Sequence, residues 1–332
     1  MNRRIYLDHA ATTPVDPRVI DAMLPYLTTH WGNPSGIYQE AREARAGLDS
    51  ARRAVAASLG AKPNEIVFTG GGSESGQPRR AGGAATRRRG DHVITTAIEH
   101  HAVLHTVQAL EREGRCQASY VGVDGEGFVD LDALAAAVTD RTVLVSVMYA
   151  NNEVGTIQPL AEVVRTVKRR NPRVIVHTDA VTAAGTLDLT VDQLGVDLLT
   201  IAAHKCYGPK GIGALYVRGR TPLSPQVLGG GQERDRRAGT ENVAGRRLRP
   251  RSASPMRNVT VATRTPPTCA TGCWTNCRRA YRACGSTVRA TAPVAWPTTS
   301  TPAWRALRVK RCCSNDMNGV AASRCSACTT AR

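Results

Sequence analysis

The chain has 332 residues, 42% of them hydrophobic, which is enough to bury the core of one large domain and a smaller one. It has no apolar run of the ~18 residues that a membrane-spanning helix needs. Its first residues, "MNRRIYLDHAATTP", lack the apolar stretch of a signal peptide. We therefore expect a cytoplasmic protein with no contact with a membrane.

The net charge of +17 is concentrated at one end of the chain. Residues 246–332 contain 16 of the 44 basic residues and one of the 27 acidic residues, a net +15, which leaves +2 for residues 1–245. Eight of the ten cysteines also follow residue 245. We therefore divide the chain into an N-terminal segment, 1–15, a large domain, 16–245, and an aberrant or truncated region, 246–332.

The first elements expected along the chain are helices and one strand. "RVIDAMLPYL" has apolar residues at helical spacing, and residues 35–60 predict an amphipathic helix with Ser35 as its N-cap and Gly60 as its stop. "EIVFTGGGSES" then predicts a short buried strand that ends in a glycine turn.

Residues 91–245 alternate apolar runs typical of strands with amphipathic runs typical of helices. The expected strands are "HVITTAI", "CQASYVGV", "TVLVSVMYA", "VIVHTDA", "LLTIAAHK" and "GALYV", and the helices between them include "HAVLHTVQALEREG", "LDALAAAV" and "LAEVVRTVKRR". This alternation predicts an α/β domain with a largely parallel sheet. Ligand-binding residues should then follow the carboxyl ends of the strands.

Two stretches break this pattern. Residues 76–90, "GQPRRAGGAATRRRG", have no apolar face and predict a poor helix. Residues 246–315 are rich in Arg, Thr, Pro and Cys. Their apolar residues follow neither the period of a helix nor that of a strand, so we expect little stable structure there.

The two strongest candidates for chemistry are a lysine and an aspartate. Lys205 follows the apolar run "LLTIAAH", and a partly desolvated lysine with a lowered pKa can form a Schiff base. Asp179 ends another apolar run, where it could hold the pyridinium nitrogen of pyridoxal phosphate. The alternatives are a solvated lysine and an aspartate that caps the next helix.

Three weaker signals follow other strands. Gly72 and Ser73 in "FTGGGSES" could form a phosphate-binding turn. His100 could stack on a flat ring or transfer protons, although histidines at such positions are commonly structural. Asn152 could point into the same crevice, or "NNE" could be a simple turn.

Eight segments of the chain resemble motifs of the cysteine desulfurases, a group of class V aminotransferases and fold-type I pyridoxal phosphate enzymes. The segments cover residues 5–75 and 91–245: "YLDHAATTP", "GNPSGIY", "EIVFTGGGSES", "EHHAVL", "ANNEVGTIQP", "HTDAV", "AHKCYGPKGIGALYV" and "GGGQERDRRAGTEN". The resemblance implies a large domain with a mixed, mostly parallel sheet and a small α+β domain, which would be incomplete here.

The resemblance also implies an activity and a cofactor. Members of the group use pyridoxal 5'-phosphate to convert L-cysteine to L-alanine. They pass the sulfur as a persulfide to an acceptor, such as an iron–sulfur scaffold protein, for iron–sulfur cluster, thio-cofactor or tRNA synthesis. By resemblance, Lys205 is the Schiff-base lysine, Asp179 the partner of the pyridinium and His100 the ring-stacking acid/base.

Further residues are assigned to the cofactor by resemblance alone. Thr240 would reach the phosphate bound by the partner subunit, so a homodimer is implied. The other positions around the cofactor are Gly72, Ser73, Asn152, Thr182, Ala202 and His204.

The persulfide carrier is assigned in the same way. "GVAASRCSACTTAR" is similar to the mobile catalytic loop of the group and places Cys328 at the nucleophile position. The Cys328 thiolate would attack the substrate sulfur, and the resemblance also allows Cys328 to act as an iron–sulfur ligand.

The chain departs from the family pattern at several places. Thr182 stands where the family has a glutamine that contacts the ring hydroxyl, and Ala202 replaces a phosphate-binding serine. Family likeness is lost at 76–90 and at 246–315, and the chain stops before the arginine that binds the substrate carboxylate. We hypothesise that both windows are frame-shifted and the C-terminus truncated, which leaves the activity of this exact chain in question. A lineage-specific replacement is the alternative, and resequencing the gene distinguishes the two.

Two other functions are compatible with some of these residues. A selenocysteine lyase or another class V-type enzyme is an alternative, but Cys328 argues against a mechanism without a catalytic cysteine. A nucleic-acid-binding protein using residues 246–332 is an alternative of another class, but this region has few aromatic residues and no known motif. We expect no metal site at Cys269, Cys273 and Cys277, because C-x3-C-x3-C does not match zinc or cluster spacings.

Overall fold

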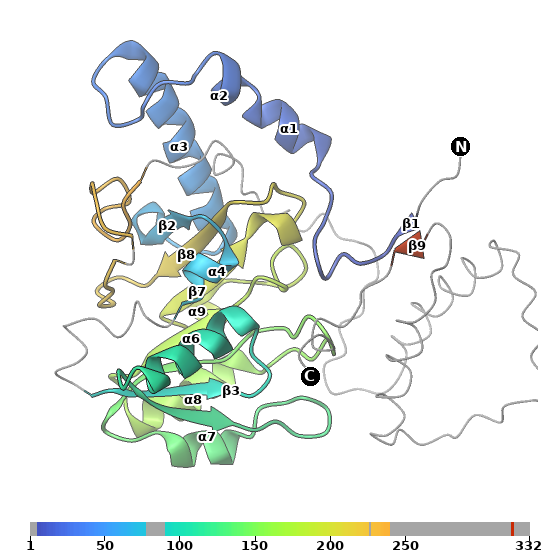
Figure 1. The fold of residues 1–332 in the computed structure, drawn as a ribbon, viewed down its shortest axis with the longest axis vertical. Helices are drawn as coiled ribbons and strands as arrows, with labels where there is room; N and C mark the ends of the chain where they lie inside the picture. Colours follow the sequence, from blue (N-terminus) through green and yellow to red (C-terminus); the bar gives the residue numbers. More distant parts are fainter. Residues whose placement is uncertain (1–4, 78–89, 226, 240–319, 322–332) are drawn as a thin grey trace, which may run out of the picture. The chain divides into compact units, whose positions relative to one another are not determined.

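The computed structural model describes residues 5–77, 90–225, 227–239 and 320–321 (Figure 1). Several predictions lie outside these residues: those on Thr240 and Cys328, on the three tail cysteines, and on nearly all of the two anomalous windows. Within the described ranges, no helix is both long and apolar enough to cross a membrane.

The described residues form a seven-stranded sheet in the order β2-β8-β7-β6-β5-β3-β4. The pairs from β7 to β4 are parallel, whereas β8 is antiparallel to both of its neighbours. The predicted α/β fold with a mostly parallel sheet is confirmed. The strands are β2 (Ile66–Thr69), β3 (His92–Thr96), β4 (Gln117–Val121), β5 (Thr142–Ser146), β6 (Ile175–Asp179), β7 (Leu198–Ala202) and β8 (Gly213–Val217).

Helices cover both faces of this sheet (Figure 1). Apolar residues of α3, α7, α8 and α9 share one core cluster with one set of strand residues, while Val107 of α6 packs with the alternate set. The helices are α3 (Gln39–Ser58), α4 (Gly72–Ser75), α6 (His101–Arg112), α7 (Leu131–Ala137), α8 (Leu160–Arg170) and α9 (Val191–Leu194), with short 3₁₀ turns at Pro63–Glu65 and Ala203–Lys205. The expected alternation of strand and helix is therefore present.

The predicted N-cap of the first long helix is wrong. Helix α3 begins at Gln39 with Tyr38 in the cap position, four residues after Ser35. The Asn33 side chain accepts the backbone N–H of Ser35 at 2.9 Å, so Ser35 belongs to a turn closed by Asn33. The predicted end is correct, because Gly60 follows the helix in the left-handed region at φ +63°.

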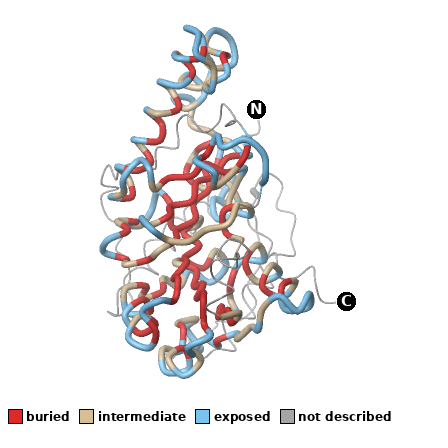
Figure 2. Tube along the Cα trace, turned by 90° about the vertical axis from the view of Figure 1, so that its left-hand side faces the viewer, coloured by how far each residue is buried: buried red, intermediate tan, exposed pale blue. Residues whose placement is uncertain are grey.

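The N-terminal elements contribute little to the core. Strand β1 (Ile5–Tyr6) pairs in parallel with β9 (Val320–Ala321). Helices α1 (Pro17–Met23) and α2 (Pro25–Thr28) have no buried residue. Figure 2 shows the buried residues concentrated in the region of the strands, with exposed residues prevailing near the top, where α1 and α2 lie.

The sheet places the candidate residues along one edge. Strands β2, β3, β5, β6 and β7 run in the same direction, so their carboxyl ends share one edge of the sheet. The glycine turn follows β2, the His100 segment follows β3, and the Asn152 segment follows β5. Asp179 ends β6, and Lys205 lies three residues after β7.

Candidate active site

Lys205 lies at the end of the short 3₁₀ turn that follows β7. The side chain is half-buried, and its Nζ donates a hydrogen bond to the backbone carbonyl of Ala10. Burial lowers the pKa of the Lys205 amine, and the carboxylates of Asp179 and Asp8 offset part of this shift. A lowered pKa exposes more of the neutral amine, which is the nucleophilic form.

An N-terminal segment crosses the Lys205 turn and fixes it. The His204 carbonyl accepts the Thr13 N–H at 2.8 Å and the Thr13 hydroxyl at 2.9 Å. The Thr13 hydroxyl in turn accepts the N–H of Tyr207 at 2.8 Å, and Tyr207 adopts a left-handed φ of 63°. These contacts join residues more than 190 positions apart, so no local pattern in the sequence predicts them. The polar residues of "HAATTP" are the only feature there that is compatible with such contacts.

Asp179 is buried at the end of β6, with 7% of its surface exposed. Its Oδ1 accepts the Val181 N–H at 2.9 Å, and Oδ2 makes no hydrogen bond within the described residues. Burial raises the pKa of the Asp179 carboxyl, while the Val181 N–H, His100 and Lys205 lower it. One carboxylate oxygen therefore holds the turn, and the other remains available to a ligand.

His100 is the N-cap residue of α6. Its Nδ1 accepts the Ala102 N–H at 3.1 Å, so the proton of the neutral ring lies on Nε2. Although the residue is exposed at the edge, desolvation lowers its pKa, an effect that nearby Lys205 reinforces and Asp179 opposes. His100 thus presents a neutral ring whose Nε2–H can donate a hydrogen bond to a ligand.

The glycine turn after β2 leaves donors free. The backbone N–H groups of Gly72 and Ser73 begin α4 and have no acceptor among the described residues. The exposed Ser73 hydroxyl also makes no hydrogen bond there. A Cβ added to Gly72 would lie 2.9 Å from Val181 Cγ2, so glycine is needed for the close approach of these two segments.

The asparagine pair after β5 divides its roles. Asn151 is buried, and its Oδ1 accepts the N–H groups of Glu153 at 2.8 Å and Val154 at 3.0 Å. Asn152 is half-buried, and its side chain makes no hydrogen bond within the described residues. The turn interpretation therefore describes Asn151, and Asn152 remains a candidate for contact with a ligand.

The remaining predicted positions lie at the same edge. Thr182 is half-buried and its hydroxyl has no hydrogen bond in the described part of the chain. Ala202 is fully buried at the end of β7, and a Cβ on Gly72 would lie 3.5 Å from its methyl group. The His204 ring contacts the Thr12 hydroxyl through Nδ1 at 3.2 Å.

One buried acid at this edge was not singled out from the sequence. Glu99 precedes His100 and is 5% exposed. Its Oε1 accepts the Met148 N–H at 2.6 Å and the Thr96 hydroxyl at 2.9 Å. An acid directly after an apolar strand was the only signal for it in the sequence.

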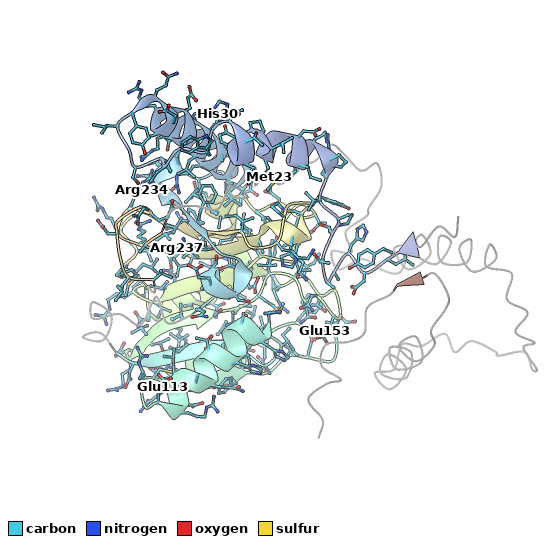
Figure 3. All side chains as sticks on the ribbon, turned by 45° about the horizontal axis from the view of Figure 1, so that its top comes forward. Met23, His30, Glu113, Glu153, Arg234 and Arg237 are labelled. Carbon is cyan, nitrogen blue, oxygen red and sulfur yellow. The ribbon has the colours of Figure 1, made fainter. Side chains whose placement is uncertain are left out.

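A loop at residues 227–239 is fixed to α3 and β2 by a buried ion pair. Glu233 binds the Arg52 guanidinium through both carboxylate oxygens, at 2.5 and 2.7 Å, and accepts the Phe68 N–H at 2.9 Å. Arg237 Nε donates to Glu74 of α4 at 2.6 Å (Arg237 is labelled in Figure 3). The loop that precedes Thr240 is therefore attached next to the glycine turn.

These groups fit pyridoxal phosphate. Asp179 Oδ2 and the N–H groups of Gly72 and Ser73 have no partner within the described part of the chain. The carboxylate oxygen suits a protonated ring nitrogen, and the N–H groups suit a phosphate. Lys205, Asp179 and His100 lie near enough to perturb one another's titration. The roles of the individual residues stay predictions.

Comparisons with known proteins identify the family. The family model described as "Aminotransferase class-V" matches residues 5–248. Cysteine desulfurase IscS from Clostridium botulinum is 48% identical over 246 residues, which are 74% of this chain and 61% of that protein. Cysteine desulfurase IscS from Dictyoglomus turgidum is 49% identical over 246 residues, 74% of this chain and 62% of that protein.

Solved structures give the same result. A structure titled "NifS-like protein" has a TM-score of 0.71 and 42% identity, covering 73% of this chain and 67% of that chain. SspA in complex with cysteine has a TM-score of 0.68 and 38% identity, covering 73% of this chain and 70% of that chain. The chain spans about three-fifths of the length of the curated relatives it matches. It belongs to the class-V aminotransferase family, whose members depend on pyridoxal phosphate.

Proposed function

We propose that this chain is a cysteine desulfurase, which converts L-cysteine to L-alanine and transfers the sulfur as a persulfide. The observation that carries this proposal is the common edge where Lys205, Asp179 and His100 interact electrostatically. The relatives with 48–49% identity bear the name cysteine desulfurase, and one structural neighbour is a complex with cysteine.

Asp179 and Lys205 would hold the cofactor. When bound, pyridoxal phosphate withdraws electrons from the α-carbon of an amino acid. The buried Asp179 carboxylate keeps a proton on the ring nitrogen, which strengthens this withdrawal. Lys205 supplies the amine that anchors the cofactor, and its lowered pKa favours the neutral form.

His100 would transfer protons. Its Nδ1 is occupied by the Ala102 N–H, so proton exchange with the substrate takes place at Nε2. Its lowered pKa keeps the ring neutral at physiological pH. In this tautomer the Nε2–H donates a hydrogen bond to the substrate. To accept the thiol proton at Nε2, the ring must adopt the other tautomer, in which Nδ1 carries the proton and no longer accepts the Ala102 N–H.

The phosphate would lie at the glycine turn. The N–H groups of Gly72 and Ser73 and the Ser73 hydroxyl have no partner among the described residues and could bind it. We infer that Thr240 of a second copy completes this site, so the active form is a homodimer. The attachment of residues 227–239 beside α4 supports a fixed path for the loop that leads to Thr240.

Cys328 would accept the sulfur. Its thiolate forms an S–S bond to the substrate sulfur as the C–S bond of the substrate breaks, and a proton replaces sulfur on the β-carbon. The products are L-alanine and a Cys328 persulfide, which a sulfur acceptor or an iron–sulfur scaffold protein takes up. Cys328 lies outside the described residues, so family resemblance alone supports this role.

The test is turnover by the purified chain. Incubation with pyridoxal phosphate, L-cysteine and a thiol reductant should yield alanine and sulfide in equal amounts. Cys328→Ser should abolish the sulfide while leaving cofactor binding unchanged. A wild-type chain that binds the cofactor but produces no alanine from cysteine contradicts the proposal.

A further inference from the structure

Glu99 links the segments that follow two neighbouring strands. Its Oε1 accepts the N–H of Met148, which follows β5, and the hydroxyl of Thr96, which ends β3. Nearby, the Asn151 Nδ2 donates to the Ile98 carbonyl at 3.1 Å. The segment that carries His100 is thus tied twice to the segment that carries Asn152.

The same connection continues to Asp179. The Tyr149 N–H, next to Met148, donates to the Asp179 carbonyl at 2.9 Å. The segments after β3 and β5 and the end of β6 therefore form one hydrogen-bonded unit. Glu99 is joined to His100 by one peptide bond and to the Asp179 backbone through Met148 and Tyr149.

The second oxygen of Glu99 is the unusual feature. Oε2 is buried and has no hydrogen-bond partner among the described residues. A buried anion with a free oxygen and a second carboxylate nearby is strongly disfavoured. Burial raises the pKa of Glu99 to about 8, and the Asp179 charge adds to this, while the hydrogen bonds from Met148 and Thr96 lower it.

We propose that Glu99 is a positioning residue that acts as a neutral carboxylic acid. Oε1 accepts the Met148 N–H, which joins the two segments, and the Thr96 hydroxyl within its own segment, and the proton resides on Oε2. In this form Glu99 fixes His100 without adding a second negative charge beside Asp179. Its influence on catalysis rests on the proposed desulfurase function, whereas its protonation state does not.

The first experiment measures stability without cofactor, as a function of pH. The charge of Asp179 raises the pKa of Glu99. His100 and Lys205 in turn lower the pKa of Asp179. Because the folded pKa is raised, the contribution of Glu99 to stability is complete below its unfolded pKa. It is lost as the pH rises towards about 8.

Glu99→Gln keeps the shape and the acceptor oxygen but cannot ionise. We expect its Tm relative to wild type to increase steadily from mildly acidic pH to about 8. Glu126→Gln, at an exposed glutamate, should show no such trend. A Glu99→Gln difference in Tm that is constant over this range would overturn the protonated state.

The second experiment compares Glu99→Gln with Glu99→Ala in the loaded enzyme. Glu99→Gln should retain turnover, whereas Glu99→Ala should lose about tenfold in kcat, the scale of one lost hydrogen bond, and should shift the pH profile set by His100. Equal damage in both variants, or none in Glu99→Ala, would overturn the positioning role. Absence of desulfurase activity in wild type would refute the proposed function but leave the first experiment intact.

Discussion

Two groups of buried charged residues, the Arg52–Glu233 pair and the Asp179 and Glu99 carboxyls, differ in how completely they are paired. In the Arg52–Glu233 pair, the guanidinium donates to both carboxylate oxygens, and the carboxylate also accepts the Phe68 N–H. At the strand edge, Asp179 and Glu99 each keep one oxygen without a partner among the described residues.

This difference separates groups that hold the fold from groups that serve a ligand. A fully paired buried ion pair fixes the loop at residues 227–239 and leaves nothing free to react. A buried carboxylate with a free oxygen is costly in the unliganded fold unless it is protonated or receives a ligand. The strand edge is therefore where substrate and cofactor chemistry belongs.

Lys205→Ala should have the largest effect, at the strand edge. We expect turnover to fall by about 10⁴-fold, the upper range for the loss of a reacting group, and the visible band of the lysine-bound cofactor to disappear. Lys210→Ala, at an exposed lysine of the same loop, is the control and should retain both. Equal loss in the two variants would contradict the assignment.

Glu233→Ala should have the next largest effect, on stability. Removing one partner of a buried pair costs about 3–5 kcal/mol of the free energy of unfolding, because the Arg52 charge stays buried. Arg45→Ala, which breaks the exposed pair with Asp49, should cost less than about 1 kcal/mol. Denaturant unfolding of both variants measures the contrast, and similar costs would refute it.

The two asparagines after β5 distinguish a residue that stabilises the fold from one that is available to a ligand. Asn151→Ala should lower the free energy of unfolding by about 1–3 kcal/mol, since the N–H groups of Glu153 and Val154 lose their acceptor and the buried Asn151 side chain is removed. Asn152→Ala should change it by less than about 0.5 kcal/mol and reduce turnover instead. If Asn152→Ala is the less stable variant, the division of roles between them is wrong.

Thr182→Gln should have the smallest effect. Its hydroxyl makes no hydrogen bond within the described residues, and by resemblance a glutamine there contacts the cofactor ring. One added hydrogen bond should tighten cofactor binding up to about tenfold. Fluorescence titration with pyridoxal phosphate checks this, and weaker binding than in wild type would contradict it.

The sheet and its reactive edge could be predicted because parallel strands are continuous apolar runs and their carboxyl ends coincide. The polar residues that directly follow such runs, Lys205, Asp179 and His100, are therefore recognisable in the sequence. The reversed direction of β8 is not, because hydrophobic periodicity is the same in both directions.

Other features depend on long-range contacts or local competition. The Lys205 bond to Ala10 and the Thr13 bonds to His204 join distant parts of the chain, which no local pattern records. The predicted cap at Ser35 failed because the Asn33 side chain competes for the same turn. Glu99 was missed because burial, which gives it significance, is a tertiary property.

The central claim is that Lys205, among five lysines, is the one that the fold prepares for pyridoxal phosphate. Reduction of the loaded protein with borohydride, followed by peptide mass spectrometry, tests it directly. We expect the cofactor mass on the Lys205 peptide alone. Label spread over Lys62, Lys168, Lys210 and Lys310, or no stable label, would contradict it.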